Sequence, residues 1–520
     1  MKSNKTKINP YSEMKTKELK VLAEQGDAEA QYKLGYRFRY GEKAKKNFAK
    51  AIEWYTKAAE QGHSHAQNNL GVCYNFGKGV KKDYSKAVEW YTKAAEQGNL
   101  GAQWNLGACY YNGTGVEQDY KKAFYWFLKA AEQDDSWAQN DIGMCYLDGY
   151  GIEKNPVKGV EWISKAVKQG YATAQFNLAY CYMYGDGVKQ DMKKAFELYK
   201  KAALQGYARA QNNLGLCYLY GAGVRKNFKK AVEWFTKAAE QGADKAQYEL
   251  GMCFEKGLGV EKNLEKAVGW YTKAAEQGNM DAQYKLALFY EFDYSLEEHI
   301  VKAFEWYKKA AKQGHAEAQY ALATFYETGE IVEEDHIKAV RWYKKAAEQG
   351  FADAQYNLAV CYLEGDGVKK NNVKAVDWYK KAVEQGVVSA YNNLGWCYEH
   401  GKGVKKDRTQ AFELYSKGAE LGDETAQFSL ALCYHFGKGI EVNPEKAVEW
   451  YNKSAEQGNP MAQTNLGDCY KEGFGVEKDL IQAKKWLTKA AEQGDPEAIK
   501  GLEVLEKPIN INKTKTLEAE

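Results

Sequence analysis

An alanine recurs every 36 residues along almost the whole chain, usually followed by glutamine. Thirteen full repeats follow one another with no insertion or deletion. A repeat of this length cannot bury its apolar faces alone, so neighbouring repeats have to stack. We count positions within each repeat from this alanine, as position 0. The alanines are Ala30, Ala66, Ala102, Ala138, Ala174, Ala210, Ala246, Ala282, Ala318, Ala354, Ala390, Ala426, Ala462 and Ala498.

Each repeat reads as two helices, A and B, with different apolar stripes. Helix A carries Ala at 0, usually Leu at +4, Gly or Ala at +5 and an aromatic residue at +8. This spacing places the apolar residues on one helical face. Helix B carries Ala at +21, usually Trp at +24 and Tyr or Phe at +25, and Ala at +28 and +29. The small residues permit close helix approach, and the pattern predicts an all-α solenoid.

Glycine and capping residues mark the ends of both helices. Glycines at +11 and +13 permit positive φ and end helix A. Asp or Asn stands at +17 in twelve repeats, for example Asp83 and Asn443, and can cap helix B. Repeat 8 lacks both loop glycines (Asp293 and Ser295), repeat 9 has Ile331 at +13, and repeat 1 has Lys43 there. We therefore expect the least regular joint around residues 289–300.

The two ends of the array differ from the repeats. Residues 1–13 read as a polar tail and residues 14–26 as an N-terminal capping helix. The thirteen repeats span 27–494, a C-terminal capping helix spans 495–506, and 507–520 reads as a second polar tail.

The whole pattern strongly resembles the Sel1-like repeat family, a relative of the tetratricopeptide repeats. Repeat 2 shows the match as Ala66-Gln67, Leu70-Gly71, Tyr74, Gly77-Lys78-Gly79-Val80, Asp83, Lys86-Ala87, Trp90-Tyr91 and Lys93-Ala94-Ala95-Glu96-Gln97-Gly98. The resemblance covers roughly residues 14–506. It implies a right-handed superhelix with a concave groove and an adaptor role, which in some bacteria includes engaging host proteins.

All ten cysteines stand at position +7, on the apolar edge of helix A. A disulfide needs Cα atoms within about 7 Å, whereas equivalent points on stacked helices lie roughly 10 Å apart. Some members of the resembled family pair two cysteines within each repeat, but this chain has one per repeat. We expect ten reduced, buried thiols, which favours a reducing compartment.

No other constellation indicates chemistry. The Gly-x-Gly-Val loops do not continue as Gly-Lys-Ser/Thr, so they are not P-loops. The seven histidines are scattered without a thiol or carboxylate cluster, so we expect neither a metal nor another cofactor. A catalytic site needs a unique group of residues, and no insertion breaks the period. We therefore expect no catalytic residues and no enzyme activity.

Charge and hydropathy narrow the partners and the location. Lys+Arg is 73 and Asp+Glu is 70, which gives a net charge of +3 and no global reason to expect nucleic acid. Lysines recur with glutamates on helix B, which favours a solvated convex face. No apolar run approaches a membrane span, and the first residues contain no apolar core of a Sec-type signal peptide. We expect a cytoplasmic protein, and secretion as an effector stays open.

Variation between repeats concentrates at +2, +6, +9 and +10 of helix A, opposite the apolar stripe. The resemblance implies that these positions line the concave groove. Asn at +3 recurs and favours a hydrogen bond between repeats. Repeats 3 to 6 present apolar residues at the groove positions, and repeats 7 to 11 present glutamates. The candidate partner-binding residues are Trp104, Tyr111, Met144, Leu147, Phe176, Tyr180, Met183, Tyr184, Leu219, Tyr220, Glu255, Glu291, Glu327, Glu364 and Glu399.

An exposed apolar surface of this extent is typical of a binding site. Tight curvature would instead bury these residues against one another, and that alternative stays open. We expect a protein–protein interaction scaffold or adaptor. Its partner would be a protein or peptide with an apolar stretch followed by basic residues. The alternatives are a hydrolase that acts on cell-wall-like substrates and a host-directed bacterial effector that uses the same groove.

Overall fold

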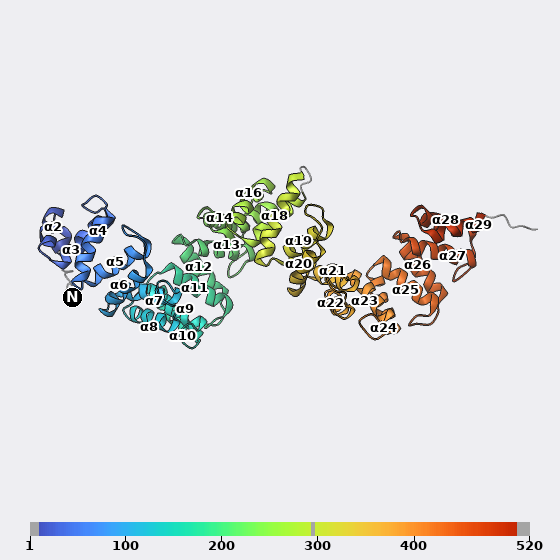
Figure 1. The fold of residues 1–520 in the computed structure, drawn as a ribbon, viewed down its shortest axis with the longest axis horizontal. Coiled ribbons are helices and arrows are strands. Elements are labelled where there is room, and N and C mark those ends of the chain that lie inside the picture. The colour runs from blue at the N-terminus through green and yellow to red at the C-terminus, as the bar shows by residue number, and fades with distance from the viewer. Residues whose placement is uncertain (1–9, 293–296, 507–520) are drawn as a thin grey trace, which may run out of the picture. The chain divides into compact units, whose positions relative to one another are not determined.

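The computed structural model describes residues 10–292 and 297–506. Within them every regular element is a helix, and two helices form each repeat (Figure 1). The A helices are α3 (Ala28–Tyr40), α5 (Ser64–Phe76), α7 (Leu100–Asn112), α9 (Ser136–Asp148), α11 (Ala172–Tyr184), α13 (Ala208–Tyr220), α15 (Asp244–Lys256), α17 (Met280–Glu291), α19 (Ala316–Thr328), α21 (Ala352–Glu364), α23 (Val388–His400), α25 (Glu424–Phe436) and α27 (Pro460–Glu472).

The B helices alternate with them along the chain. They are α4 (Phe48–Glu60), α6 (Tyr84–Glu96), α8 (Tyr120–Ala131), α10 (Pro156–Lys168), α12 (Met192–Leu204), α14 (Phe228–Glu240), α16 (Leu264–Glu276), α18 (Glu297–Gln313), α20 (His336–Glu348), α22 (Asn372–Glu384), α24 (Arg408–Glu420), α26 (Pro444–Glu456) and α28 (Leu480–Glu492). The chain divides into two compact units, Met1–Ala274 and Ala275–Glu520. In each unit the helices pack against their neighbours in chain order, as an α-solenoid does.

The caps follow the sequence pattern. Asp83 and Asn443 at +17 each accept a hydrogen bond from a backbone N–H in the first turn of helix B. Gly77 at +11 ends α5 in the left-handed region. Gly79 at +13 has a second reason to be glycine, because a Cβ there would lie 2.8 Å from the backbone of Phe48 in the preceding repeat. The loop glycines therefore allow both the turn after helix A and the close approach of the loop to the preceding repeat.

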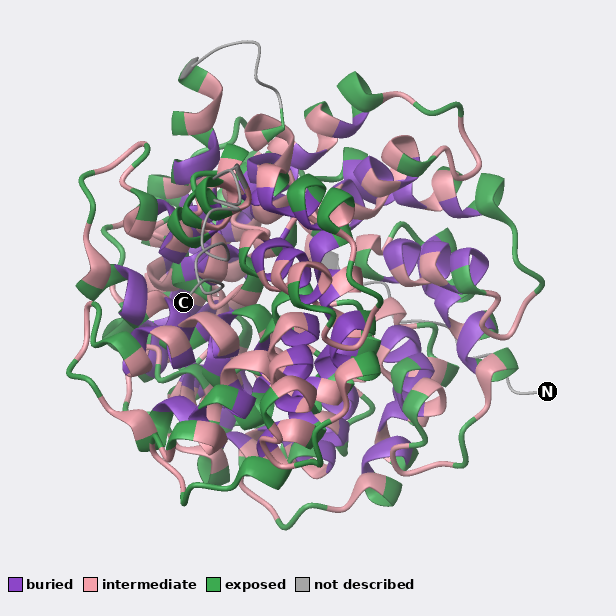
Figure 2. Cartoon of the chain, turned by 90° about the vertical axis from the view of Figure 1, so that its right-hand side faces the viewer, coloured by how far each residue is buried: buried purple, intermediate pink, exposed green. Residues whose placement is uncertain are grey.

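The glycine at +5 allows the two helices of one repeat to touch. A Cβ on Gly71 would lie 2.6 Å from the ring of Tyr91 at +25, and one on Gly215 would lie 2.5 Å from Phe235. The +25 ring thus lies flat against the backbone of helix A, and most of these rings are fully buried. In Figure 2 the buried positions recur along the helices, while the connecting loops are largely exposed or intermediate.

Glutamines connect successive repeats. Gln67 at +1 donates to the carbonyl of Ala59 in the preceding helix B, at 3.0 Å. Its own side-chain oxygen accepts a hydrogen bond from Gln97 at +31, at 2.7 Å. The same pair of contacts is repeated by Gln319, which bonds to Ala311 and Gln349. The Ala-Gln pair is therefore a structural joint that satisfies buried polar groups.

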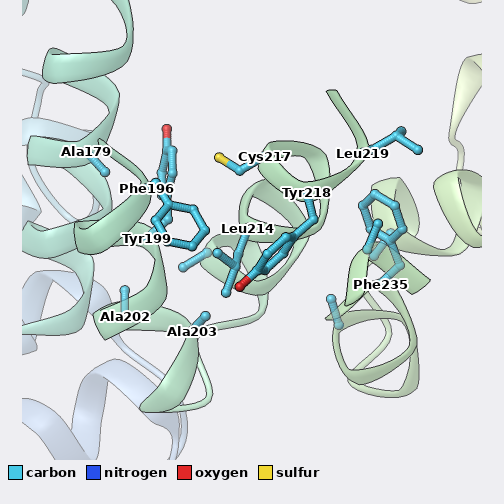
Figure 3. Packing of buried hydrophobic residues seen from close by; sticks show 14 of the residues in the cluster. Ala179, Phe196, Tyr199, Ala202, Ala203, Leu214, Cys217, Tyr218, Leu219 and Phe235 are labelled. Atoms are coloured by element: carbon cyan, nitrogen blue, oxygen red, sulfur yellow. The ribbon is translucent and has the colours of Figure 1, made fainter. Parts of the chain in front are cut away.

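The cysteines lie in the core, as expected. All ten are buried and unpaired with one another. Figure 3 shows Cys217 on α13 with Leu214 and Tyr218, between Tyr199 of α12 and Phe235 of α14. Burial raises the pKa of the Cys145 thiol to about 12, so the thiol stays protonated at neutral pH.

The loops that lack glycine behave differently from one another. Lys43 keeps the turn by adopting a φ of 56°, in the left-handed region. Ile331 does not adopt a positive φ. Among the described non-glycine residues, those with a positive φ are Lys43 and Asp134. In repeat 8, α17 ends one residue early, and α18 begins at Glu297 rather than at +18. Asp293 and Ser295 lie outside the described residues.

The ends of the array are helical. Leu19 and Ala23 of α2 (Thr16–Glu24) are buried against repeat 1, and α29 (Pro496–Glu506) follows the last repeat. The expected polar tail 1–13 is wrong in its last residues, because α1 (Pro10–Glu13) packs on the array. There the Tyr11 hydroxyl donates to Asp27 at 2.9 Å, and Arg37 donates to the Tyr11 carbonyl.

Candidate functional site

The groove positions of helix A form two levels. Aromatic residues at +2 pack against the +25 ring of their own repeat, with ring centroids 5.6 Å apart for Phe176 and Tyr199 and 5.6 Å for Tyr320 and Tyr343. Residues at +9 also reach the +25 side chain, so +2 and +9 make a partly buried floor. Residues at +10 are mostly exposed, whereas those at +6 are half-buried in most repeats and exposed at Tyr180 and Trp396.

The glutamates at +9 accept hydrogen bonds from buried tyrosines. Each bond joins helix A to helix B of the same repeat. The pairs are Tyr271 with Glu255 (2.5 Å), Tyr307 with Glu291, Tyr343 with Glu327 (2.7 Å) and Tyr415 with Glu399 (2.9 Å). Burial and the adjacent carboxylate raise the pKa of each of these tyrosines, so they remain donors at neutral pH.

The five candidate glutamates are therefore not equivalent. Four of them are half-buried and serve the fold through these bonds. Glu399 also pairs with Lys438 at 2.8 Å, which compensates its charge and helps to hold its pKa below the usual range. Glu364, at +10, is exposed. The sequence contains a pattern that indicates the bonds between +9 and +25. In several repeats a Tyr at +25 occurs with a polar residue at +9, whereas Phe127 and Phe235 at +25 occur with Tyr111 and Leu219 at +9.

Part of the expected apolar surface is buried. Leu147, Phe176 and Leu219 expose 5%, 7% and 4% of their surface, so the expectation of exposure is wrong for these three. Phe176 packs on Tyr199 and Tyr207, and the Arg209 guanidinium lies over its ring at 4.9 Å. The half-buried members of the set are Trp104, Tyr111, Met144 and Met183.

Three tyrosines of the set are exposed. Tyr180 and Tyr184 stand at +6 and +10 of α11, with ring centroids 4.5 Å apart, and expose 50% and 65% of their surface. Tyr220 stands at +10 of α13 in the next repeat and exposes 67%. Together they form what we call the tyrosine patch of the N-terminal unit.

Asp141 is a residue that the sequence did not single out. It accepts hydrogen bonds from the Trp104 indole at 2.8 Å and from Asn140 at 3.1 Å. Burial nevertheless raises its pKa to about 6, which outweighs both hydrogen bonds. Its partner Trp104 also meets Trp137 edge-on at 5.1 Å, and Trp137 is half exposed.

The recurring polar residues serve the fold. Asn105 and Asn177 at +3 donate to residue +2 of the preceding repeat, at 3.0 and 2.8 Å, which confirms a hydrogen bond between repeats for these two. Lysines at +27 lie over the tryptophan at +24 in ten repeats, for example Lys165 over Trp162 at 3.6 Å. Many lysines of helix B thus make cation–π contacts within the fold.

Within residues 10–292 and 297–506, no group of three or more His, Cys, Asp or Glu side chains is placed to hold a metal ion. Among the described helices, none is both long enough and apolar enough to cross a bilayer.

Stacked helix pairs in repeats of constant length, with most A helices ended by glycine, define this chain as an α-solenoid repeat protein. Thirteen successive segments match the Sel1 repeat, and the chain belongs to the Sel1 repeat family. The matched residues are 28–63, 64–99, 101–135, 138–171, 172–207, 208–242, 244–279, 281–315, 316–351, 352–387, 388–423, 425–459 and 460–495.

Solved structures of the same family resemble the chain. The c5321 protein, a protective antigen of uropathogenic Escherichia coli with an SLR fold, is 33% identical over 97% of this chain and 100% of its own, with a TM-score of 0.57. A Sel1 repeat protein from Oxalobacter formigenes is also 33% identical, over 47% of this chain and 96% of its own, with a TM-score of 0.43. No curated protein matches the chain in the corresponding search.

Proposed function

We propose that this protein is a scaffold or adaptor that binds a partner protein or peptide on the helix A face. The tyrosine patch supports this proposal most directly. Tyr180, Tyr184 and Tyr220 are large rings that the fold leaves exposed on helices of consecutive repeats. Exposed aromatic residues with a polar hydroxyl are enriched where proteins bind one another.

The partner would carry an apolar stretch, which would contact the tyrosine patch, followed by basic residues. The 33% sequence identity to c5321, a protective antigen of uropathogenic Escherichia coli, supports including host proteins among the candidate partners. Such a chain would act as an effector through the same surface.

The test compares capture by the wild type with capture by the variant Tyr180→Ser/Tyr184→Ser/Tyr220→Ser. Tyr125→Ser is the matched control, because Tyr125 is 52% exposed but lies on helix B, in α8. A protein captured by the wild type is purified, and its binding kinetics are measured. The triple variant should lose at least tenfold in affinity at both low and high salt, while the control should bind normally. Equal binding by the triple variant would overturn the proposal.

A further inference from the structure

The C-terminal unit contains a pocket of about 440 Å³ that is lined by α17, α18 and α19 and by Phe351, the residue before α21. Its lining combines aromatic rings and carboxylates. Tyr284, Tyr320 and Phe351 supply the rings, and Glu291, Glu317 and Glu330 supply the carboxylates. No lysine or arginine is among the described residues that line it.

The aromatic wall is held in place by its neighbours. Tyr320 meets Phe351 with ring centroids 5.2 Å apart and Tyr343 at 5.6 Å. Tyr284 stacks on His315 at 4.2 Å. These rings line the pocket and are half-buried, so their neighbours restrict their movement.

Two of the pocket carboxylates have neighbours that do not offset a negative charge. Glu291 accepts the Tyr307 hydroxyl through one oxygen, and Tyr307 is a neutral partner. Glu317 lies 3.2 Å from His315. Burial lowers the pKa of His315 below its usual value, so that ring is mainly neutral at pH 7 and does not cancel the charge.

We propose that this pocket binds one basic side chain, a lysine or arginine carried by a partner peptide. Aromatic faces attract a cation electrostatically, and carboxylates accept its charge-assisted hydrogen bonds. An anionic group would gain neither interaction, and a neutral N–H donor would lose the cation–π attraction and the charge–charge part of the hydrogen bonds. The inference rests on the proposed function in one respect, namely that the cation belongs to a protein partner.

The test uses two small probes that differ in charge and hardly in shape, N-acetyl-arginine methylamide and N-acetyl-citrulline methylamide. Saturation-transfer difference NMR on the full chain measures the binding of each. The arginine probe should give a saturable signal, the corresponding lysine probe should compete with it, and the citrulline probe should bind at least tenfold more weakly. Equal binding of citrulline to the wild type would overturn the inference without recourse to any variant.

Two variants then locate the site. Glu291→Gln/Glu317→Gln removes two charges from the pocket, and the new amide oxygen at 291 can still accept the Tyr307 hydroxyl. Glu305→Gln/Glu348→Gln removes two exposed charges from α18 and α20 and is the matched control. The first variant should raise the Kd for the arginine probe about tenfold and the second should leave it unchanged. Equal loss in both variants would show general charge attraction and overturn the site.

This result is independent of the partner capture described above. Probe binding that is selective for charge, together with normal partner binding by the tyrosine variant, would keep the pocket and reject the tyrosine patch. Equal binding of the arginine and citrulline probes, together with a loss of partner binding in the tyrosine variant, would reject the pocket and keep the tyrosine patch.

Discussion

At the scale of single residues, the +25 tyrosines show how the same side chain is satisfied in different ways. The Tyr415 hydroxyl donates a hydrogen bond to Glu399 at 2.9 Å, and the Tyr379 hydroxyl accepts one from the side-chain amide of Asn393 in the next repeat at 3.3 Å. Tyr91 has a buried hydroxyl without a hydrogen-bond partner in the described chain. Because leaving a buried polar group unpaired is costly, this difference has a measurable consequence.

Replacing Tyr415 and Tyr91 by phenylalanine should have different effects on local stability. Tyr415→Phe loses a hydrogen bond to a carboxylate, so it should destabilise its repeat by about 1.5 kcal/mol and speed amide exchange in α24 roughly tenfold. Tyr91→Phe removes only an unpaired hydroxyl, so exchange in α6 should stay equal or become slower. Hydrogen exchange by mass spectrometry checks both. Faster exchange in Tyr91→Phe than in Tyr415→Phe would contradict the argument.

Asp141 predicts a pH dependence in repeat 4. Its folded pKa of about 6 lies above the ordinary aspartate value of 3.8, so the folded state favours the protonated acid. The stability that this shift contributes is fully present below pH 3.8 and is lost as the pH rises through 6. Asp141→Asn, whose amide oxygen can still accept the Trp104 indole, should therefore stabilise α9 at pH 7.5 by on the order of 1–3 kcal/mol. At pH 4.5 the variant should match the wild type. Exchange rates of 136–148 at the two pH values decide this, and an equal effect at both would count against it.

At the scale of helices and loops, glycine at +13 has two roles, and repeat 9 lacks it. Gly223 has a φ of 71°, and a Cβ there would lie 2.0 Å from the Met192 carbonyl oxygen. Ile331 cannot reproduce that turn without strain, and it avoids positive φ. The loop around it therefore follows a different backbone path, although the repeat keeps its length.

We expect amides in 325–336 to exchange faster than those in the matching loop 217–228. The altered path keeps the bond from Gly329 to the Phe325 carbonyl, which matches that from Gly221 to the Cys217 carbonyl. Among the described backbone bonds, Glu330 makes none that matches the second bond of the regular loop, from Ala222 to the Cys217 carbonyl. The variant Ile331→Gly is the control, because it should restore the regular turn and slow the exchange toward that of 217–228. Equal rates in the two wild-type loops would refute this expectation.

The helices and their ends could be predicted from the sequence because capping and glycine positions act locally. The division of the groove residues between floor and surface could not. Leu219 and Tyr220 are adjacent and both apolar in character, yet one is 4% and the other 67% exposed. Leu219 belongs to the same core cluster as Phe235 of helix B, and no single helix determines that packing. The sequence likewise places the glutamates at +9 among the groove positions of helix A, but their hydrogen bonds to the +25 tyrosines depend on the packing of helix B.

At the scale of the whole molecule, the tryptophans at +24 are not equally buried. Trp54 of repeat 1 exposes 7% and clusters with Leu19 of α2, whereas Trp234 of repeat 6 is half-buried with Lys237 over its ring at 4.2 Å. The sequence pattern alone predicts one core position for both. The capping helix therefore completes the core at the end of the array.

The chain should respond to damage as a one-dimensional array, since each repeat contacts only its neighbours. Trp54→Ala removes a buried ring, so it should cost roughly 3–5 kcal/mol, and Trp234→Ala should cost less because its ring is already partly solvated. Exchange measured along the whole chain should quicken within α2 to α6 in the first variant and within α12 to α16 in the second. The C-terminal unit should keep its protection in both variants. A uniform loss of protection along the chain would show that the array unfolds as a single cooperative body. A larger effect of Trp234→Ala than of Trp54→Ala would show that the burial of the +24 ring does not set its contribution to stability.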